Sequence, residues 1–376
     1  MAVLSDRALN RALLARQWLL ARQPGGVLGA VRHLVGLQAQ EPHDPYVALR
    51  ARLRQFDPHE LGRLLTDREV LRMGLMRATI HLVTADDALV LRPLVQDVLE
   101  RNMRSVARFR AVADAVDMDA VGTATRARME ASPATGPQLR TFLAERFPDA
   151  DAAALADVIR LVLPLVQITP RAVWGRTLRP TWTTLESWLG RSPGVPDPAA
   201  VIRRYLAAFG PASAADFATW SRLTRVRELF EPLADELVRF TDERGRTLYD
   251  VPGAPLPDPE TPAPVRFLPQ YDNVFLSHDD RSRIAPSGFW DRVLAVDSRP
   301  HFVLVDGMVA GIWRLAVPGR SGPPPQPGDS ARLVVTPFRT LPAAARDELQ
   351  AEGVALLGLL APAATAVEVE LADPML

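Results

Sequence analysis

Two amide side chains that stand close together in the sequence are the first residues that suggest chemistry. Gln38 and Gln40 lie in the segment Gly36-Leu-Gln-Ala-Gln-Glu-Pro-His-Asp-Pro-Tyr46. Gln38 falls on the apolar stripe of a helix that we expect to begin at Val27, and an amide on a buried face needs hydrogen-bond partners. If that helix ends near Ala39, as the proline that follows favours, both amides can turn toward one pocket. The alternative is that the two glutamines only bond the free carbonyl groups at the end of the helix.

A second group of polar side chains crowds the stretch from Leu268 to Arg283, within which we expect residues 274–276 to form a strand. Their chemical types are those that bind phosphates or bases. The candidate nucleic-acid contacts here are Tyr271, Asp272, His278, Arg281 and Arg283. A surface loop held by ion pairs would have the same composition. No second histidine or cysteine stands near His278 at the spacing of metal ligands, so we predict no metal site.

Two further segments place arginine beside ring or hydroxyl side chains. In Arg77-Ala-Thr-Ile-His81, Thr79 and His81 would share one face of a strand. In Pro170-Arg-Ala-Val-Trp-Gly-Arg176, two arginines flank Trp174, which suits phosphate contact combined with base stacking. The candidate nucleic-acid contacts in these segments are Arg77, Thr79, His81, Arg171 and Arg176. His81 and Trp174 are equally compatible with an ordinary buried core.

The residue types that the chain lacks exclude several kinds of chemistry. Its 376 residues include neither cysteine nor lysine, which removes thiolate catalysis, cysteine-bound metals, lysine Schiff bases and Walker-type phosphate loops. A Rossmann glycine fingerprint, a serine nucleophile elbow and a His-Glu-x-x-His motif are also missing. The 44 basic residues, all arginine, balance 44 acidic residues. Nucleic-acid binding would therefore depend on a local arginine face rather than on net charge.

The elements that must position these residues follow a recurring order of helices and then a hairpin. The clearest case is 198–252, where a helix ends at Gly210-Pro211 and Ser213 with Asp216 forms a capping box for the next helix. Thr224 can cap a third helix that reaches about Asp235. Two apolar runs around Arg244-Gly245 then indicate a hairpin. Three helices followed by a hairpin are typical of the winged helix, a variant of the helix-turn-helix.

The same order predicts the rest of the architecture. Near the N-terminus, helices capped by Ser5, starting at Val27 and covering 58–67 precede a β-rich run at 70–83, and a weaker copy begins at the capping box of Thr135. Beyond residue 264, strands and the Asp306-Gly307 hairpin signal dominate. We therefore expect a mainly α protein with an α+β C-terminal part. Its predicted units are tandem winged-helix domains at 1–95, 96–190 and 191–255, followed by a β-rich α+β domain at 256–376.

These segments together resemble a known family, the bacterial winged-helix DNA glycosylases of the AlkZ/YcaQ type. The resemblance spans nearly the whole chain and rests on the arrangement of its segments. The segments that carry it are Gly36-Leu-Gln-Ala-Gln40, Met76-Arg-Ala-Thr-Ile-His-Leu82, Pro170-Arg-Ala-Val-Trp-Gly175, Phe209-Gly-Pro-Ala212, Leu268 to Arg283, and Val305-Asp-Gly-Met-Val-Ala-Gly-Ile-Trp313. The AlkZ-like branch is recognised by two glutamines around one aliphatic residue, which here are Gln38, Ala39 and Gln40. The other branch has aspartate at the second position.

The resemblance implies tandem winged helices, a β-rich C-terminal part and removal of alkylated bases from double-stranded DNA. Gln38 and Gln40 would be the catalytic residues of a monofunctional glycosylase that acts on alkylated purines of the N7-alkylguanine type. Base excision repair and self-resistance to a DNA-alkylating natural product would be its roles. We expect no cofactor, no obligate protein partner and a monomer. The sequence predicts no membrane span and no signal peptide, and hence a cytoplasmic, nucleoid-associated enzyme. The DNA-probing hairpin of the family is not placed by the sequence.

Amide side chains suit this reaction only because the leaving group is already activated. Glutamine cannot strongly deprotonate water, but it can orient a water molecule and bind an extruded nucleotide. An N7-alkylguanine carries positive charge, so its glycosidic bond breaks without protonation of the base. Positioning and electrostatic stabilisation of the sugar then remain for the protein. Two alternatives without catalysis are a winged-helix transcriptional regulator and a module that binds the alkylating compound itself.

Overall fold

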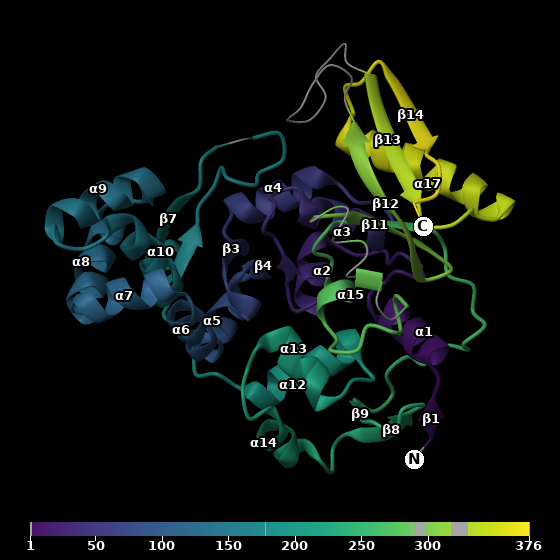
Figure 1. Ribbon diagram of the computed structural model, residues 1–376, viewed down its shortest axis with the longest axis horizontal. Helices are drawn as coiled ribbons and strands as arrows, with labels where there is room; N and C mark the ends of the chain where they lie inside the picture. The colour runs from purple at the N-terminus through teal and green to yellow at the C-terminus, as the bar shows by residue number, and fades with distance from the viewer. Residues whose placement is uncertain are drawn as a thin grey trace.

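The computed structural model describes residues 2–176, 178–286, 289–290, 293, 297, 299–316 and 330–375. Its strands form three sheets of three, five and six strands. Figure 1 shows a group of helices at one end of the long axis, the six-stranded sheet beside it, and the C-terminal sheet with its long helix at the other end. Among the described residues, no helix is both long and apolar enough to cross a membrane.

Two of the four N-terminal helices begin where a local side chain caps them. Ser5 accepts a hydrogen bond of 3.2 Å from the backbone amide of Ala8, and Asp57 accepts one from His59 at the start of a later helix. The helices of this part are α1 (Asp6–Arg16), α2 (Val27–His33), α3 (Asp44–Arg52) and α4 (Pro58–Thr66). The caps at Ser5 and at the start of α4 occur where the sequence predicts helices.

Helix α2 ends earlier than the sequence predicts. It stops at His33, not near Ala39, and the short strand β2 (Leu37–Gln38) follows. Gly36 has φ of +91°, and a Cβ atom there would lie 2.6 Å from a methyl group of Val83. A left-handed glycine in close contact with a neighbouring strand ends the helix and turns the chain into the sheet. Gln38 therefore lies on a strand and does not continue a helical stripe.

The six-stranded sheet joins two parts of the chain. Its order is β2-β4-β3-β6-β7-β5, with β2 at the edge. The remaining strands are β3 (Val70–Gly74), β4 (Ile80–Thr84), β5 (Ala134–Thr135), β6 (Leu165–Gln167) and β7 (Thr181–Thr184). Because β3 pairs with β6, one sheet runs across the predicted boundary at residue 95, and the division into domains stays a prediction.

A helical group covers one end of this sheet (Figure 1). Thr135 and Gln138 form the predicted capping box at the start of one helix. Buried apolar side chains of five of these helices and of the sheet, among them Val121, Leu139 and Ile159, pack into one core. The helices are α5 (Ala85–Leu94), α6 (Gln96–Ser105), α7 (Ala107–Ala115), α8 (Met118–Ala131), α9 (Gly136–Arg146), α10 (Ala152–Val162) and α11 (Leu185–Leu189).

The segment after residue 190 contains the three helices and the hairpin that the sequence predicts. The capping box of Ser213 and Asp216 is present, and Gly245 at the hairpin turn has φ of +77°. The elements are α12 (Pro198–Phe209), α13 (Ala214–Ser221), α14 (Val226–Phe230), a 3-10 turn at Glu231–Leu233, β8 (Val238–Asp242) and β9 (Thr247–Asp250). Helix α14 is shorter than predicted, since Pro232 lacks the amide that would continue it. Strand β1 (Val3–Leu4) pairs in parallel with β8.

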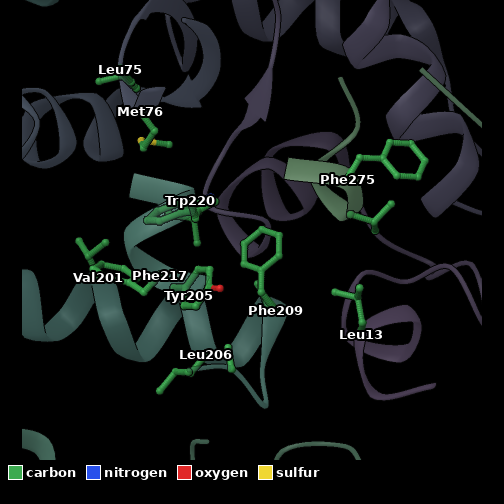
Figure 2. Close-up of a cluster of buried hydrophobic side chains, with 14 of the residues drawn as sticks. Leu13, Leu75, Met76, Val201, Tyr205, Leu206, Phe209, Phe217, Trp220 and Phe275 are labelled. Atoms are coloured by element: carbon green, nitrogen blue, oxygen red, sulfur yellow. The ribbon is translucent and has the colours of Figure 1, made fainter. Parts of the chain in front are cut away.

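An aromatic cluster ties this segment to the rest of the molecule. The rings of Tyr205 and Trp220 lie 5.2 Å apart, and the hydroxyl of Tyr205 donates to the carbonyl of Ser277 at 2.6 Å. Figure 2 shows Trp220, from α13, between the α12 side chains and Met76. Met76 belongs to the 3-10 turn η1 (Met76–Ala78) that joins β3 to β4. The turn between these strands therefore packs on α13.

The C-terminal part is a five-stranded sheet of order β10-β11-β12-β13-β14, with α17 (Ala343–Leu360) packed on it. The strands are β10 (Arg266–Leu268), β11 (His301–Val305), β12 (Met308–Ala316), β13 (Ser330–Pro337) and β14 (Ala366–Leu371). Asp306-Gly307 forms the predicted hairpin turn between β11 and β12. The strand predicted at 274–276 is wrong, because α15 (Asn273–Leu276) begins there behind its cap, Asp272.

Candidate active site and nucleic-acid interface

Gln38 and Gln40 flank a buried alanine at the edge of the six-stranded sheet. Ala39 is fully buried, and its backbone amide donates to the carbonyl of Ile80 at 2.7 Å. Gln38 is buried and lies opposite His81 of β4, whereas Gln40 is exposed. The side-chain oxygen of Gln40 accepts a hydrogen bond of 3.4 Å from the amide of Ile80. The amide of Gln40 is thus held against β4 and the oxygen of Gln38 meets Arg77, so the two amides do not cap the end of α2 as the alternative interpretation supposes.

Arg72 holds the backbone carbonyl of Ala39, which lies between the two glutamines. This buried arginine of β3 donates from Nη2 to the carbonyl of Ala39, while its Nε and Nη1 have no partner among the described residues. Burial lowers the pKa of Arg72 to about 10. The sequence analysis missed Arg72. A charged residue within the apolar run Val70-Leu-Arg-Met73 is the signal that could have found it.

Arg77 holds the side chain of Gln38. Its Nη2 donates to Gln38 Oε1 at 2.9 Å and lies 3.1 Å from His81 Nε2, and its Nη1 donates to the carbonyl of Trp220 at 2.7 Å. Burial, together with the charges of Arg222 and Arg281, lowers the pKa of Arg77 to about 9. The half-buried guanidinium therefore serves the protein's own groups in this structure, and the predicted role of Arg77 as a DNA contact gives way to this internal one.

His81 is neutral and has a defined tautomer. Its Nδ1 lies 3.0 Å from the carbonyl of Thr79, and a carbonyl only accepts, so Nδ1 carries the proton. Nε2 is then the acceptor for Arg77. Burial, followed by the charge of Arg77, lowers the pKa of His81 to about 3. The predicted alternative of a buried, bonded histidine describes His81 in the structure. Thr79 is half-buried, and its hydroxyl donates to the carbonyl of Met76 at 3.2 Å.

An open pocket of about 490 Å³ lies beside Arg77 and is lined by arginines. Arg222 and Arg281, whose charges act on Arg77, both line it, together with Thr219 and Trp290. The guanidinium of Arg281 lies 5.1 Å from the centre of the Trp290 ring. Carboxylates are also present, and Asp279 accepts from the hydroxyl of Thr219 at 3.1 Å. Cations and an aromatic ring around an open hollow can bind a nucleic-acid backbone and stack on a base.

Arg222 is a residue that the sequence analysis missed. It follows the last residue of α13 with φ of +63°, and its carbonyl accepts from Arg101 at 2.9 Å. The signal was its position in the turn before the third helix of a predicted winged helix, which is the helix that enters the groove in that motif. The structure places its side chain in the same pocket as the predicted contact Arg281.

Three predicted DNA contacts are buried. Asp272 pairs with Arg52, His278 Nε2 donates to the carbonyl of Phe209 at 3.0 Å, and Arg283 donates to the carbonyl of Pro211 at 2.9 Å. Burial lowers the pKa of His278 to about 3. A side chain that is sealed inside the protein cannot touch a phosphate or a base. Asp272, His278 and Arg283 therefore hold the fold together, which corrects their predicted role.

The remaining predicted contacts lie near the surface. Tyr271 is half-buried and Arg176 is exposed. Arg171 donates to the carbonyl of Leu178 at 2.9 Å. Trp174, between the two arginines, packs against the ring of Tyr46 at 4.7 Å. This tryptophan belongs to the core, as the alternative interpretation supposes, and Arg171 and Arg176 stay predicted contacts.

No group of histidine and acidic side chains among the described residues could hold a metal ion. Asp44, the one carboxyl in this region with a strongly raised pKa, is buried, and burial raises its pKa to about 7. Its Oδ2 has no partner within the described part of the chain. Such a carboxyl is only about half ionised at pH 7 and is therefore a weaker partner for a cation than an ordinary aspartate.

Hydrogen bonds through Arg77 fix the uncharged amide of Gln38 at the edge of the sheet. The arginines of the pocket act on the same Arg77 and have the chemistry of a nucleic-acid contact. The comparisons with known proteins agree with such a contact. The family model for the AlkZ-like DNA glycosylases matches residues 31–359. The chain therefore belongs to the AlkZ-like DNA glycosylase family, and it is an enzyme of the DNA glycosylase class.

A solved structure has the same fold. The DNA glycosylase AlkZ of Streptomyces sahachiroi superposes with a TM-score of 0.73 at 20% identity, covering 98% of this chain and 100% of that one. Among curated proteins, no sequence matches.

Proposed function

We propose that the protein is a monofunctional DNA glycosylase that hydrolyses the N-glycosidic bond of alkylated purines of the N7-alkylguanine type. It acts as a monomer on double-stranded DNA, and Gln38 and Gln40 hold the extruded nucleotide and the hydrolytic water at the anomeric carbon. The observation that carries this proposal is the pair of amides around buried Ala39, with Gln40 exposed and held against β4, and Gln38 held by Arg77.

The charges of the site support a cationic leaving group. His81 lies opposite Gln38 on the neighbouring strand, and burial keeps it neutral by lowering its pKa to about 3. Arg77 stays protonated near pH 7, because its pKa is lowered only to about 9. These groups offer no general acid for protonating a neutral base, whereas an N7-alkylguanine needs none. Orientation and placement of the water then account for the protein's share of the rate acceleration.

The parts of the chain that bind the duplex are the arginine-lined pocket and the predicted winged-helix units at 1–95, 96–190 and 191–255. Support for the last of these is the order of α12, α13 and α14 followed by the β8–β9 hairpin. Arg222, at the end of α13, and Arg281 would neutralise phosphates, and both are close enough to Arg77 for their charges to act on it.

The reaction is tested with a duplex that contains a single N7-methylguanine. The protein should release the base and leave an abasic site that hot alkali converts to a strand break, while an undamaged duplex should stay intact. Tight binding without base release would support a DNA-binding regulator instead. A duplex carrying a bulky N7 adduct tests the range of substrates. Higher survival of bacteria that express the protein and are exposed to a DNA-alkylating natural product would support a role in self-resistance.

A further inference from the structure

The contact between Arg77 and Gln38 decides which half of the amide can meet a ligand. A guanidinium group has only donors, so the atom of Gln38 that lies 2.9 Å from Arg77 Nη2 must be the oxygen. The –NH₂ group then points away from Arg77. Within the described part of the chain, Gln38 Nε2 has no acceptor, and it is not one of the atoms sealed from solvent. Gln38 therefore presents two unused N–H donors.

Three elements hold the guanidinium in this orientation. Arg77 is in the left-handed region with φ of +57°. Its Nη1 donates to the carbonyl of Trp220 in α13, and its Nη2 faces both Gln38 in β2 and His81 in β4. His81 is fixed in turn through Nδ1 by the carbonyl of Thr79. A rotation of the Gln38 amide would put its –NH₂ group against the cation and break this chain of hydrogen bonds.

The charge of Arg77 also strengthens the outward donors. A hydrogen bond from an ionised donor is stronger than a neutral one, and it draws electron density from the amide toward the oxygen. Bonds in such a chain polarise one another, so the N–H groups of Gln38 become better donors. Gln40 differs in each respect. It is exposed, and its oxygen makes only a 3.4 Å contact with the amide of Ile80, so it can still accept a hydrogen bond from water.

We propose that Arg77 is a positioning residue that fixes Gln38 as a hydrogen-bond donor to a sugar or phosphate oxygen of the extruded nucleotide, and that the side-chain oxygen of Gln40 accepts a hydrogen bond from the hydrolytic water and so orients it. This division of roles rests on the proposed glycosylase function. A nucleophilic water needs a lone pair free to reach the anomeric carbon, so its protons should go to acceptors. A fixed donor aimed at the water oxygen would occupy that lone pair. Gln38, whose –NH₂ group is fixed as a donor, is therefore suited to bind the nucleotide. Gln40, whose amide is free, is suited to bind the water.

The donor role of Gln38 is tested by Gln38→Glu, which keeps an oxygen toward Arg77 and replaces the outward –NH₂ by a second oxygen. Single-turnover excision of N7-methylguanine should fall by about 10²-fold or more. The matched control is Gln40→Glu, which adds the same charge but keeps an acceptor, and it should lose much less. Gln38→Glu excision equal to that of the wild type, or a larger loss in Gln40→Glu, would overturn the assignment.

A binding measurement separates this inference from the glycosylase proposal. A duplex with a tetrahydrofuran abasic nucleotide retains the sugar and phosphate oxygens and needs no catalysis. Gln38→Glu should weaken its binding by about tenfold or more, and Gln40→Glu should weaken it less. If the wild type releases no base while this difference persists, the glycosylase proposal fails and the donor assignment stands. If the wild type releases the base and both variants bind equally, only the donor assignment fails.

The role of Arg77 is tested by a double-mutant cycle. Arg77→Met should slow excision by about 10²-fold in the wild type, because the amide loses its orientation. In the Gln38→Ala background the same change should cost little, since no amide remains to be oriented. Arg92→Met is the matched control, because Arg92 is also buried and donates to the carbonyls of Leu161 and Val162 at 3.0 Å. Equal losses for Arg77→Met in both backgrounds would show that Arg77 does not act through Gln38.

Discussion

Arg52 and Asp272 form a two-point ion pair that joins parts of the chain 220 residues apart. Both nitrogen–oxygen distances are 2.7 Å, and neither side chain is exposed to solvent. Arg52 also donates to the side-chain oxygen of Gln17 at 3.1 Å. Arg52 ends α3, the helix after the glutamine segment, and Asp272 caps α15. The pair therefore anchors the candidate site to the C-terminal part.

Removing one partner of this pair should be far more damaging than removing an exposed pair. Asp272→Ala leaves the Arg52 cation buried without a counter-charge, and we expect a loss of about 3–5 kcal/mol in the free energy of unfolding. Glu236→Ala is the control, because its pair with Arg203 is exposed and should cost less than about 1 kcal/mol. Urea titrations of the two variants check this. Similar losses would show that the buried pair does not anchor the fold.

Duplex binding should depend on the arginines of the pocket that Arg222 and Arg281 line. Each phosphate contact that is removed should lower the slope of log K against log salt concentration by about 0.9. We expect this change for Arg222→Gln and for Arg281→Gln. Arg346→Gln, on the exposed side of α17, is the control and should leave the slope unchanged. Fluorescence anisotropy at several salt concentrations gives the slopes, and three equal slopes would place the DNA on another surface.

Buried histidines should make the fold sensitive to acid. Burial lowers the pKa of His81 and of His278 to about 3 and that of His301 to about 4, against 6.5 for the free side chain. The folded pKa is lower, so the unfolded chain binds more protons below pH 6.5. Stability is therefore present above that pH and is lost as the pH falls toward the folded values. The expected loss is up to about 1.4 kcal/mol per pH unit for each histidine.

His301→Phe tests how much one of these histidines contributes to the loss of stability in acid. The ring of His301 packs on Trp313 with centroids 4.5 Å apart, and its buried Nδ1 has no partner among the described residues. Phenylalanine can keep the ring contact and has no proton to bind. Unfolding at about pH 7.5 and about pH 5 should show a smaller acid loss for the variant than for the wild type. The same loss in both proteins would rule out His301 as a source of acid sensitivity.

Asp44 should make the folded protein less stable as the pH rises, which is opposite to the effect of the histidines. Burial raises its pKa from 3.8 to about 7, so the carboxyl favours the folded state below pH 3.8, and this contribution is lost as the pH rises through 7. Asp44→Asn removes the charge and keeps an oxygen that can accept from Gln270. The melting temperature of the variant should exceed that of the wild type at pH 8, with a smaller difference at pH 5.5. A gain confined to the lower pH would contradict the raised pKa.

Local signals predicted the elements whose ends are set by neighbouring residues. The caps at Ser5, Ser213 and Thr135 each depend on a side chain and a backbone amide a few residues away. Proline and glycine signals likewise placed the end of α12 and the turns of two hairpins. The sequence also singled out Gln38 and Gln40.

Contacts between distant residues account for what the sequence did not predict. Pairing with β4 draws Leu37–Gln38 into a strand, although the apolar spacing favours a longer helix. The short apolar run at 274–276 suits a strand or a buried helix equally, and the cap by Asp272 decides for the helix. The partners that bury Asp272 and His278 come from other parts of the fold. For the same reason the contact of Arg77 with Gln38 could not be derived from spacing.

The central claim is that Gln38 and Gln40 perform catalysis, and single-turnover excision of N7-methylguanine by Gln38→Ala, Gln40→Ala and the double variant tests it most directly. Each single change should slow excision by about 10²-fold or more, while the melting temperature and the binding of an undamaged duplex stay close to those of the wild type. Gln55→Ala, an exposed amide elsewhere, is the control and should excise normally. Excision by the double variant at the wild-type rate would remove both glutamines from the mechanism.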